Sequence, residues 1–168
     1  RSSAASDVYK RQPHYAWTTT TPTGPFSKGE ESKIRKSLLE IMAAHRIPYA
    51  ATASVAYPMD FLNKLEKAKN YRGCRVIHVQ APCPTGWGYD TARTVELGKL
   101  AVESGMWWLA EYENDHLRLT YKPKELKPVE SYLKGQRRFR HLKDEDFVEI
   151  TKLRDDEWER VKRVFNVE

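Results

Sequence analysis

A strand–helix–strand pattern in the first half of the chain constrains its fold more than any other feature of the sequence. The run 49–55 (YAATASV) is short, small and apolar, which is typical of a strand buried on both faces. Pro58 is placed to begin a helix over residues 59–69, and the run 74–80 (CRVIHVQ) predicts a second strand. Two strands joined by one helix form a crossover unit of a parallel sheet. The pattern therefore predicts an α/β fold.

The other segments predict further helices and one hairpin. Helical spacing of apolar residues predicts helices over the ranges 27–46, 95–103, 129–134 and 144–164. The apolar face of the last helix consists of Phe147, Ile150, Leu153, Val161 and Val164. Alternating segments at 107–112 and 116–121, joined by ENDH, predict a hairpin. Because two parallel strands cannot bury both faces of a sheet, we expect a truncated domain that lacks a segment before residue 13.

The stretch 81–88, APCPTGWG, places Cys83 between two prolines at the end of the second predicted strand. Ligands of α/β proteins gather at the carboxyl ends of parallel strands. A ligating cysteine followed directly by proline also recurs in bacterial iron–sulfur proteins. Cys83 is therefore a candidate metal ligand, and a buried structural cysteine is the alternative that the residues alone leave open.

Composition favours a globular domain, with 40% hydrophobic and 31% charged residues. No apolar run approaches the roughly 20 residues that a membrane helix requires, and no signal peptide is recognisable. We therefore expect a cytoplasmic protein without a membrane partner. Residues 1–12 read like a translated sequencing adapter, so we treat them as a non-native scar. In that segment Arg1, Lys10 and Arg11 against Asp7 contribute +2 of the net charge of +6.

The densest basic cluster of the remaining chain consists of Arg137, Arg138, Arg140, His141 and Lys143. Three acidic residues follow it at once, so it is not the continuous cationic stripe that tracks phosphates. We therefore expect no nucleic-acid partner, and a surface facing solvent or another subunit at this cluster.

The remaining cysteine, histidine and tryptophan residues favour structural roles. Cys74 and Cys83 cannot complete a four-thiolate site by themselves, and we expect Cys74 in the core. None of the histidines has a partner at ligand spacing; they are His14, His45, His78, His116 and His141. Trp107 and Trp108 open the predicted hairpin and are expected to pack.

Five blocks in one order resemble the β subunit of 2-oxoacid:ferredoxin oxidoreductases, with pyruvate:ferredoxin oxidoreductase the most similar type. The blocks are WTTTTPTG at 17–24, AAHRIPYAATASVAYPMDF at 43–61, IHVQAPCPTGWG at 77–88, TVELGKLAVESGMW at 94–107 and KPVESYLKGQRRFRHL at 127–142. The resemblance runs from about Tyr15 to the C-terminus and covers only the second half of that subunit.

This resemblance implies an enzyme that decarboxylates pyruvate or a related 2-oxoacid on thiamine diphosphate and Mg²⁺. Such an enzyme passes electrons through iron–sulfur clusters to ferredoxin and transfers the acyl group to coenzyme A. Cys83 matches the family's fourth thiolate ligand of a [4Fe–4S] cluster, and the family's other three ligand cysteines lie in the half that this chain lacks. No thiamine- or Mg²⁺-binding residue can be named, and the threonines at 18–21 have no assigned role. Trp108 and Ala110 depart from the commoner family pattern, which leaves the exact 2-oxoacid open.

The resemblance implies the C-terminal half of a thiamine-diphosphate-binding fold, with a parallel sheet and flanking helices. We expect a partial thiamine-diphosphate-binding domain over 13–105, and a hairpin with a helical extension over 106–168. Other subunits and ferredoxin are the expected partners, and we expect the fragment alone to be inactive. Two alternatives remain. One is a version of the enzyme for branched-chain or aryl 2-oxoacids. The other is a non-catalytic interaction module with a structural Cys83 and a basic patch from Arg137 to Lys143.

Overall fold

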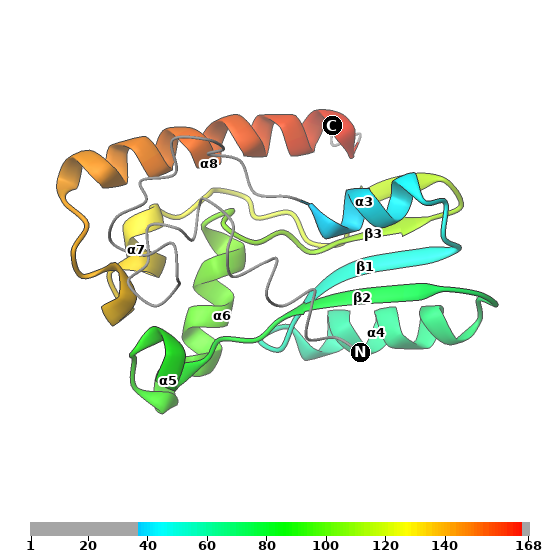
Figure 1. The fold of residues 1–168 in the computed structure, drawn as a ribbon, viewed down its shortest axis with the longest axis horizontal. Helices are drawn as coiled ribbons and strands as arrows, with labels where there is room; N and C mark the ends of the chain where they lie inside the picture. Colours follow the sequence, from blue (N-terminus) through cyan, green and yellow to red (C-terminus); the bar gives the residue numbers. More distant parts are fainter. Residues whose placement is uncertain (1–36, 166–168) are drawn as a thin grey trace.

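Four strands form one mixed sheet in the computed structural model, which describes residues 37–165 (Figure 1). Their order is β2-β1-β3-β4, and their bounds are β1 (Tyr49–Ser54), β2 (Arg75–Gln80), β3 (Ala110–Glu113) and β4 (His116–Leu119). Strand β1 pairs in parallel with β2 and antiparallel with β3, and Ala51 lies opposite both Ile77 and Glu111. The described part of the chain therefore has an α/β fold.

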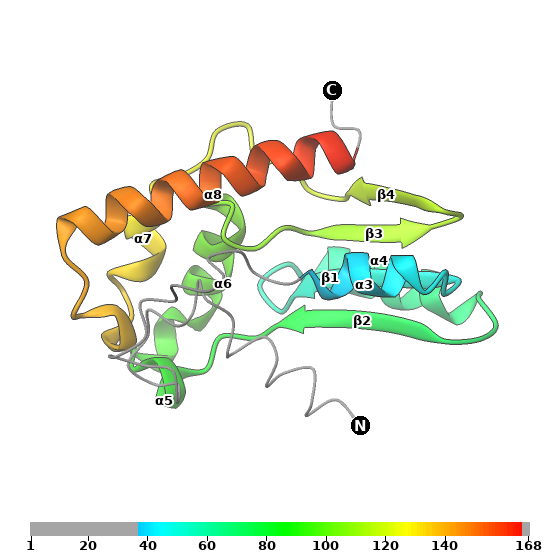
Figure 2. The ribbon, with the colours of Figure 1, turned by 45° about the horizontal axis from the view of Figure 1, so that its top comes forward.

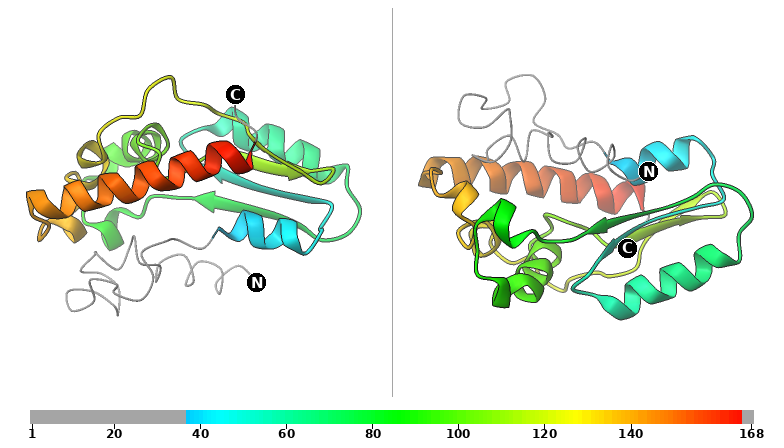
Figure 3. Two further views of the ribbon diagram at one scale, coloured as in Figure 1. Left: turned by 90° about the horizontal axis from the view of Figure 1, so that it is seen from above. Right: turned by 60° about the horizontal axis from the view of Figure 1, so that its bottom comes forward.

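The crossover unit predicted from the sequence is confirmed. Helix α4 (Pro58–Lys69) connects β1 to β2, and proline occupies its first turn as expected. All six residues of β1 are buried, because α4 packs on one face of the sheet and α3 (Leu38–Ala44) on the other (Figures 1 and 3). Small side chains such as Ala51 and Ala53 let both helices approach the central strand.

The prediction of a purely parallel, two-stranded sheet is wrong. Strand β3 of the predicted hairpin pairs with β1, so the hairpin extends the sheet to four strands (Figure 2). The turn at Asn114 and Asp115 is confirmed, since both residues have positive φ angles of 52° and 61°. The sheet therefore crosses residue 105, where we placed a domain boundary. The division into domains stays a prediction, and residues 1–12 lie outside the described part.

The remaining helices are α5 (Pro84–Trp87), η1 (Thr91–Arg93), α6 (Thr94–Glu103), α7 (Val129–Leu133), η2 (Arg137–Phe139) and α8 (Asp144–Val164). Of these, α6, α7 and α8 begin within one residue of their predicted starts, whereas the short α5, η1 and η2 were not predicted. The helix expected over 27–46 is wrong in one respect. Ser37 has an extended backbone and caps α3 by accepting a hydrogen bond from the Glu40 N–H, so no continuous helix crosses it.

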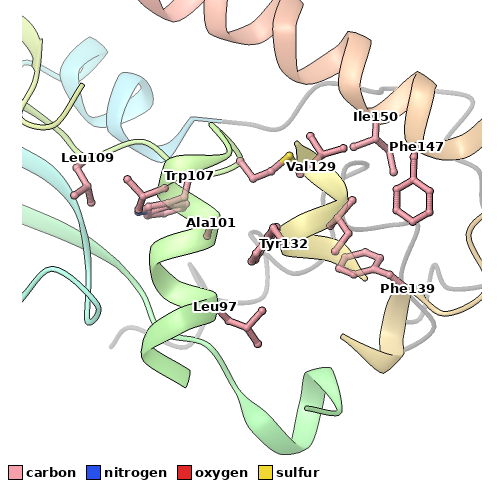
Figure 4. Close-up of a cluster of buried hydrophobic side chains, with 12 residues drawn as sticks. Leu97, Ala101, Trp107, Leu109, Val129, Tyr132, Phe139, Phe147 and Ile150 are labelled. Atoms are coloured by element: carbon pink, nitrogen blue, oxygen red, sulfur yellow. The ribbon is translucent and has the colours of Figure 1, made fainter. Parts of the chain in front are cut away.

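Two hydrophobic clusters lie under α8. The first joins α6, α7 and the start of α8, and Figure 4 shows Phe147 and Ile150 pointing toward Val129. The second joins α3, the hairpin and the end of α8 around Leu39 and Val161. Val164, expected on the apolar face of this helix, is instead 39% exposed. Helix α8 thus holds the sheet and the helical layer together.

Helix α4 exposes two leucines and buries a lysine. Leu62 and Leu65 are exposed, whereas the Lys64 side chain is buried. The Lys64 ammonium donates hydrogen bonds to the Thr52 carbonyl, Asp60 and Thr120, which satisfies its three N–H groups.

None of the helices within residues 37–165 combines the length and the apolar composition that a membrane span requires.

Candidate functional site

The loop 81–88 follows β2 directly and lies beyond its carboxyl end, where the chain turns into the single helical turn α5 (Figure 1). Cys83 is the residue before α5, with an extended backbone, and its Sγ accepts a hydrogen bond from the Gly86 N–H at 3.3 Å. Gly88 ends the turn with φ at 70°, a left-handed conformation that favours glycine. Loop 81–88 therefore contains a tight turn in which a backbone N–H is directed at the sulfur of Cys83.

Cys83 is exposed, so the alternative of a buried structural thiol is wrong. Cys74 is also exposed, which contradicts its expected place in the core. The two cysteines lie before and after β2, at opposite ends of the strand. They do not form one site.

The carboxyl ends of β1 and β2 meet beside this loop. Ser54, the last residue of β1, donates a hydrogen bond of 2.8 Å from its hydroxyl to Oε1 of Gln80, the last residue of β2. Gln80 is 2% exposed, and its Nε2 has no hydrogen-bond partner among residues 37–165. A buried amide donor without an acceptor costs free energy, which favours a further polar group at this strand end.

Cys83 is the only His, Cys, Asp or Glu residue in the loop 81–88. Between residues 37 and 165 no group of three or more His, Cys, Asp or Glu side chains could hold a metal ion. Cys83 nevertheless fits one corner of an iron–sulfur site, because its thiol is accessible and receives an N–H···S hydrogen bond, as cluster-bound thiolates do. Among the described residues, Cys83 is thus a candidate ligand, and no complete metal centre is present.

The basic cluster that follows α7 is not a uniform surface. Arg137 and Arg140 are exposed, but Arg138 is 5% exposed and stacks on the Trp87 ring of the Cys83 loop. The prediction of a cluster facing solvent or another subunit is therefore wrong for Arg138. Sequence reasoning missed this contact because Trp87 and Arg138 lie far apart in the chain.

A second polar site escaped the sequence analysis. Glu111 of β3 is 1% exposed and accepts hydrogen bonds from the Tyr49 hydroxyl at 3.0 Å and the Lys67 ammonium at 2.7 Å, and it forms an ion pair with Arg118. Burial alone would raise the pKa of Glu111, but these hydrogen bonds and the charges of Lys67 and Arg118 together lower it. A cavity of about 550 Å³ is lined by Glu111, Lys67, Arg118 and Lys64. The charged groups of this site bind one another, so we assign the site a structural role.

The aromatic residues at the start of the hairpin have the packing role that we expected. Trp107 and Trp108 are 2% and 4% exposed, and the Trp107 indole N–H donates to the Ala53 carbonyl at 3.1 Å. His78 meets the Trp107 ring edge-on, with 5.0 Å between ring centroids. The threonines at 18–21 and His14 lie outside the described residues.

Comparison with known proteins gives consistent matches. The chain is 53% identical over 138 residues to the pyruvate synthase subunit PorB of Methanothermobacter thermautotrophicus, covering 82% of this chain and 48% of that protein. It is 46% identical over 157 residues to the ketoisovalerate oxidoreductase subunit VorB of Pyrococcus abyssi, covering 92% and 50%. It is 44% identical over 149 residues to PorB of Thermotoga maritima, covering 86% and 46%. The chain thus spans about half the length of these relatives. No family model matches it.

Proposed function

We propose that this chain, which belongs to the β subunits of 2-oxoacid:ferredoxin oxidoreductases, forms part of the centre at which such an enzyme oxidises a 2-oxoacid. Thiamine diphosphate with Mg²⁺ would stabilise the carbanion, and a [4Fe–4S] cluster would carry single electrons to ferredoxin while the acyl group passes to coenzyme A. Pyruvate is the favoured substrate, since relatives named for pyruvate synthase reach 53% identity. The similarity to VorB keeps a branched-chain 2-oxoacid as the second candidate.

The observation that carries this proposal is the geometry of the Cys83 loop. An accessible thiol at the carboxyl end of a parallel strand, with the Gly86 N–H at 3.3 Å from its sulfur, suits a thiolate that ligates iron. Hydrogen bonds to a ligating sulfur raise the reduction potential of a cluster. We assign to Cys83 one of the four thiolate positions, and the resemblance places the other three in the half of the subunit that this chain does not match.

The described residues fit the polar side of such a centre as well. Gln80, at the end of β2, has a buried amide nitrogen without a hydrogen-bond partner in the described part of the chain. Ser54 fixes the orientation of that amide through its hydroxyl. Ser54 and Gln80 together thus position the Gln80 Nε2 donor beside the loop. We assign no residue to thiamine diphosphate or Mg²⁺.

A non-catalytic interaction module is not supported by the same geometry. That alternative requires Cys83 in the core and the cluster around Arg138 on the surface. The thiol is exposed, which contradicts the first requirement. Arg138 is buried, whereas Arg137 and Arg140 of the patch are exposed, so the second requirement is met only in part.

The test is ferredoxin reduction by the complete oxidoreductase that contains this chain, purified anaerobically with its partner subunits. We expect reduction that depends on coenzyme A and has a higher kcat/KM with pyruvate than with 3-methyl-2-oxobutanoate. The reverse preference would move the assignment to the branched-chain type. Failure of every 2-oxoacid to reduce ferredoxin would overturn the proposal.

A further inference from the structure

We infer that Arg138 is a positioning residue for the iron–sulfur centre: it clamps the Cys83 loop through Trp87, and its buried positive charge raises the midpoint potential of the cluster that Cys83 ligates. This inference rests on the proposed function. Arg138 belongs to η2, which lies more than fifty positions after Cys83 in the sequence. The structure brings the two segments together.

The clamp consists of a buried cation on an aromatic ring. The Arg138 guanidinium carbon lies 3.9 Å from the centroid of the Trp87 ring and 4.6 Å from that of Phe139. Arg138 and Trp87 are 5% and 7% exposed. A desolvated guanidinium over an indole gains more than an exposed one, because water does not compete for the cation.

A hydrogen-bonded chain fixes the plane of this guanidinium. Arg138 donates from Nε to Gln136 Oε1 at 2.8 Å, and Gln136 donates from Nε2 to the Tyr132 carbonyl at 2.7 Å. Gln136 is 2% exposed and Tyr132 1% exposed. The hydrogen-bonded chain to α7 thus fixes the orientation in which the guanidinium contacts the loop.

A backbone contact reinforces the clamp at the end of the loop. The Arg137 N–H donates to the Gly88 carbonyl at 3.2 Å. A Cβ atom at Gly88 would lie 2.7 Å from the Cβ of Arg137, so the two segments approach as closely as a glycine permits. Loop 81–88 is therefore held against η2 by both a side-chain and a main-chain contact.

The charge of Arg138 acts in the same neighbourhood as Cys83. Burial raises the pKa of the Tyr89 hydroxyl and its hydrogen bond with Thr94 lowers it, while Cys83 and Arg138 act on it in opposite directions. The guanidinium therefore lies beside the loop of Cys83, as its 3.9 Å distance from the Trp87 ring, four positions after Cys83, shows directly. A fixed buried cation stabilises the more negative, reduced state of a nearby cluster, and this raises its potential. A surface arginine is screened by water and salt and has a much smaller effect.

The experiment measures the midpoint potential of the cluster by redox titration with electron paramagnetic resonance, in the complete oxidoreductase. Arg138→Gln removes the charge and keeps a hydrogen-bonding side chain. Arg140→Gln is the matched control, because Arg140 is exposed two positions away. Arg138→Lys keeps the charge and loses the planar stacking. Iron content and circular dichroism are measured on each protein.

We expect Arg138→Gln to lower the potential, so that the reduced fraction at a fixed potential falls several-fold, and Arg140→Gln to leave it unchanged. We expect Arg138→Lys to assemble with a potential close to that of the native enzyme, and this variant keeps the inference open to refutation if Arg138→Gln does not fold. A loaded Arg138→Gln enzyme with the native potential would overturn the inference, and so would a lowered potential in Arg138→Lys. Absence of a cluster in the native enzyme would overturn the proposed function instead.

Discussion

Gly88 combines two demands at one residue, a left-handed backbone and a close approach to η2. Its φ of 70° is unfavourable for any residue with a Cβ atom, and that atom would also lie 2.7 Å from Arg137 Cβ. Gly105 shares nearly the same φ, 71°, but faces the movable ends of the Arg154 and Leu126 side chains at 3.2 Å. Substitutions at these two glycines therefore separate the free-energy cost of backbone strain from that of steric contact.

We predict that Gly88→Ala lowers the free energy of unfolding by about 2–3 kcal/mol, and Gly105→Ala by about 1 kcal/mol. The difference arises because a backbone-attached Cβ at position 137 cannot rotate away, whereas side-chain ends can. Thermal and urea denaturation of the two variants provide the measurement. Equal losses would show that η2 does not press on the loop.

Single residues set the limit of what could be predicted from the sequence. The APCPTGWG motif indicated a ligand-bearing turn, and the observed turn has a backbone donor at the Cys83 sulfur. The sequence did not predict that Cys74 is exposed and Lys64 buried, because a residue type has only an average tendency to be buried. Lys64 is buried because three acceptors from three different segments converge on its ammonium.

At the scale of elements, α8 connects the two layers through two arginines of different burial. Arg154 is 8% exposed and donates to the carbonyls of Ser104 at 2.7 Å and Lys127 at 3.1 Å. Arg160 forms a paired contact of 2.7 and 2.8 Å with the Glu40 carboxylate of α3 and is about one-third exposed. We therefore expect the contacts of the more buried Arg154 to contribute more to the stability of the fold than those of Arg160.

We predict that Arg154→Met destabilises the fold by about 2–3 kcal/mol, because it leaves the buried Ser104 carbonyl without a donor. Arg160→Met should cost about 0.5–1 kcal/mol, since a partly exposed ion pair is screened. Chemical denaturation of both variants at the same pH gives the comparison. A larger loss for Arg160→Met would contradict this order.

The elements themselves were largely predictable, and their pairing was not. Helix α8 begins at Asp144 and ends at Val164 as expected, because apolar periodicity and an acidic first turn are local signals. The pairing of β3 with β1 joins Ala51 to Glu111, sixty positions apart. No local pattern records such a partner, so the sheet was predicted with too few strands.

At the scale of the whole molecule, the Glu111 carboxylate of β3 connects two other strands of the sheet, β1 and β4, with helix α4. Its partners Tyr49, Lys67 and Arg118 come from β1, α4 and β4. The pKa of Glu111 is lowered in the folded protein, so its contribution to stability is present above the unfolded value of about 4.3 and is lost as the pH falls through the folded value. Acid should therefore loosen these contacts together.

We predict that Glu111→Gln lowers stability at pH 7 by about 1–3 kcal/mol, because a buried, charge-assisted network loses its anion. The variant should also lose less stability than the native protein between pH 5 and about pH 3. Denaturation midpoints over this range are the measurement. Glu66→Gln is the control, since Glu66 forms an exposed pair with Lys69. Identical acid dependence in Glu111→Gln and the native protein would refute the role of this network.

The iron content of two cysteine variants tests the central claim most directly. Both cysteines are exposed and they lie at opposite ends of β2, so Cys74→Ala is the matched control for Cys83→Ala in the complete oxidoreductase. We predict that Cys83→Ala loses the cluster that Cys83 ligates and with it ferredoxin reduction, while thiamine diphosphate still binds and Cys74→Ala retains the native iron content. A native iron content and an unchanged cluster spectrum in Cys83→Ala would contradict the assignment of Cys83 as a ligand.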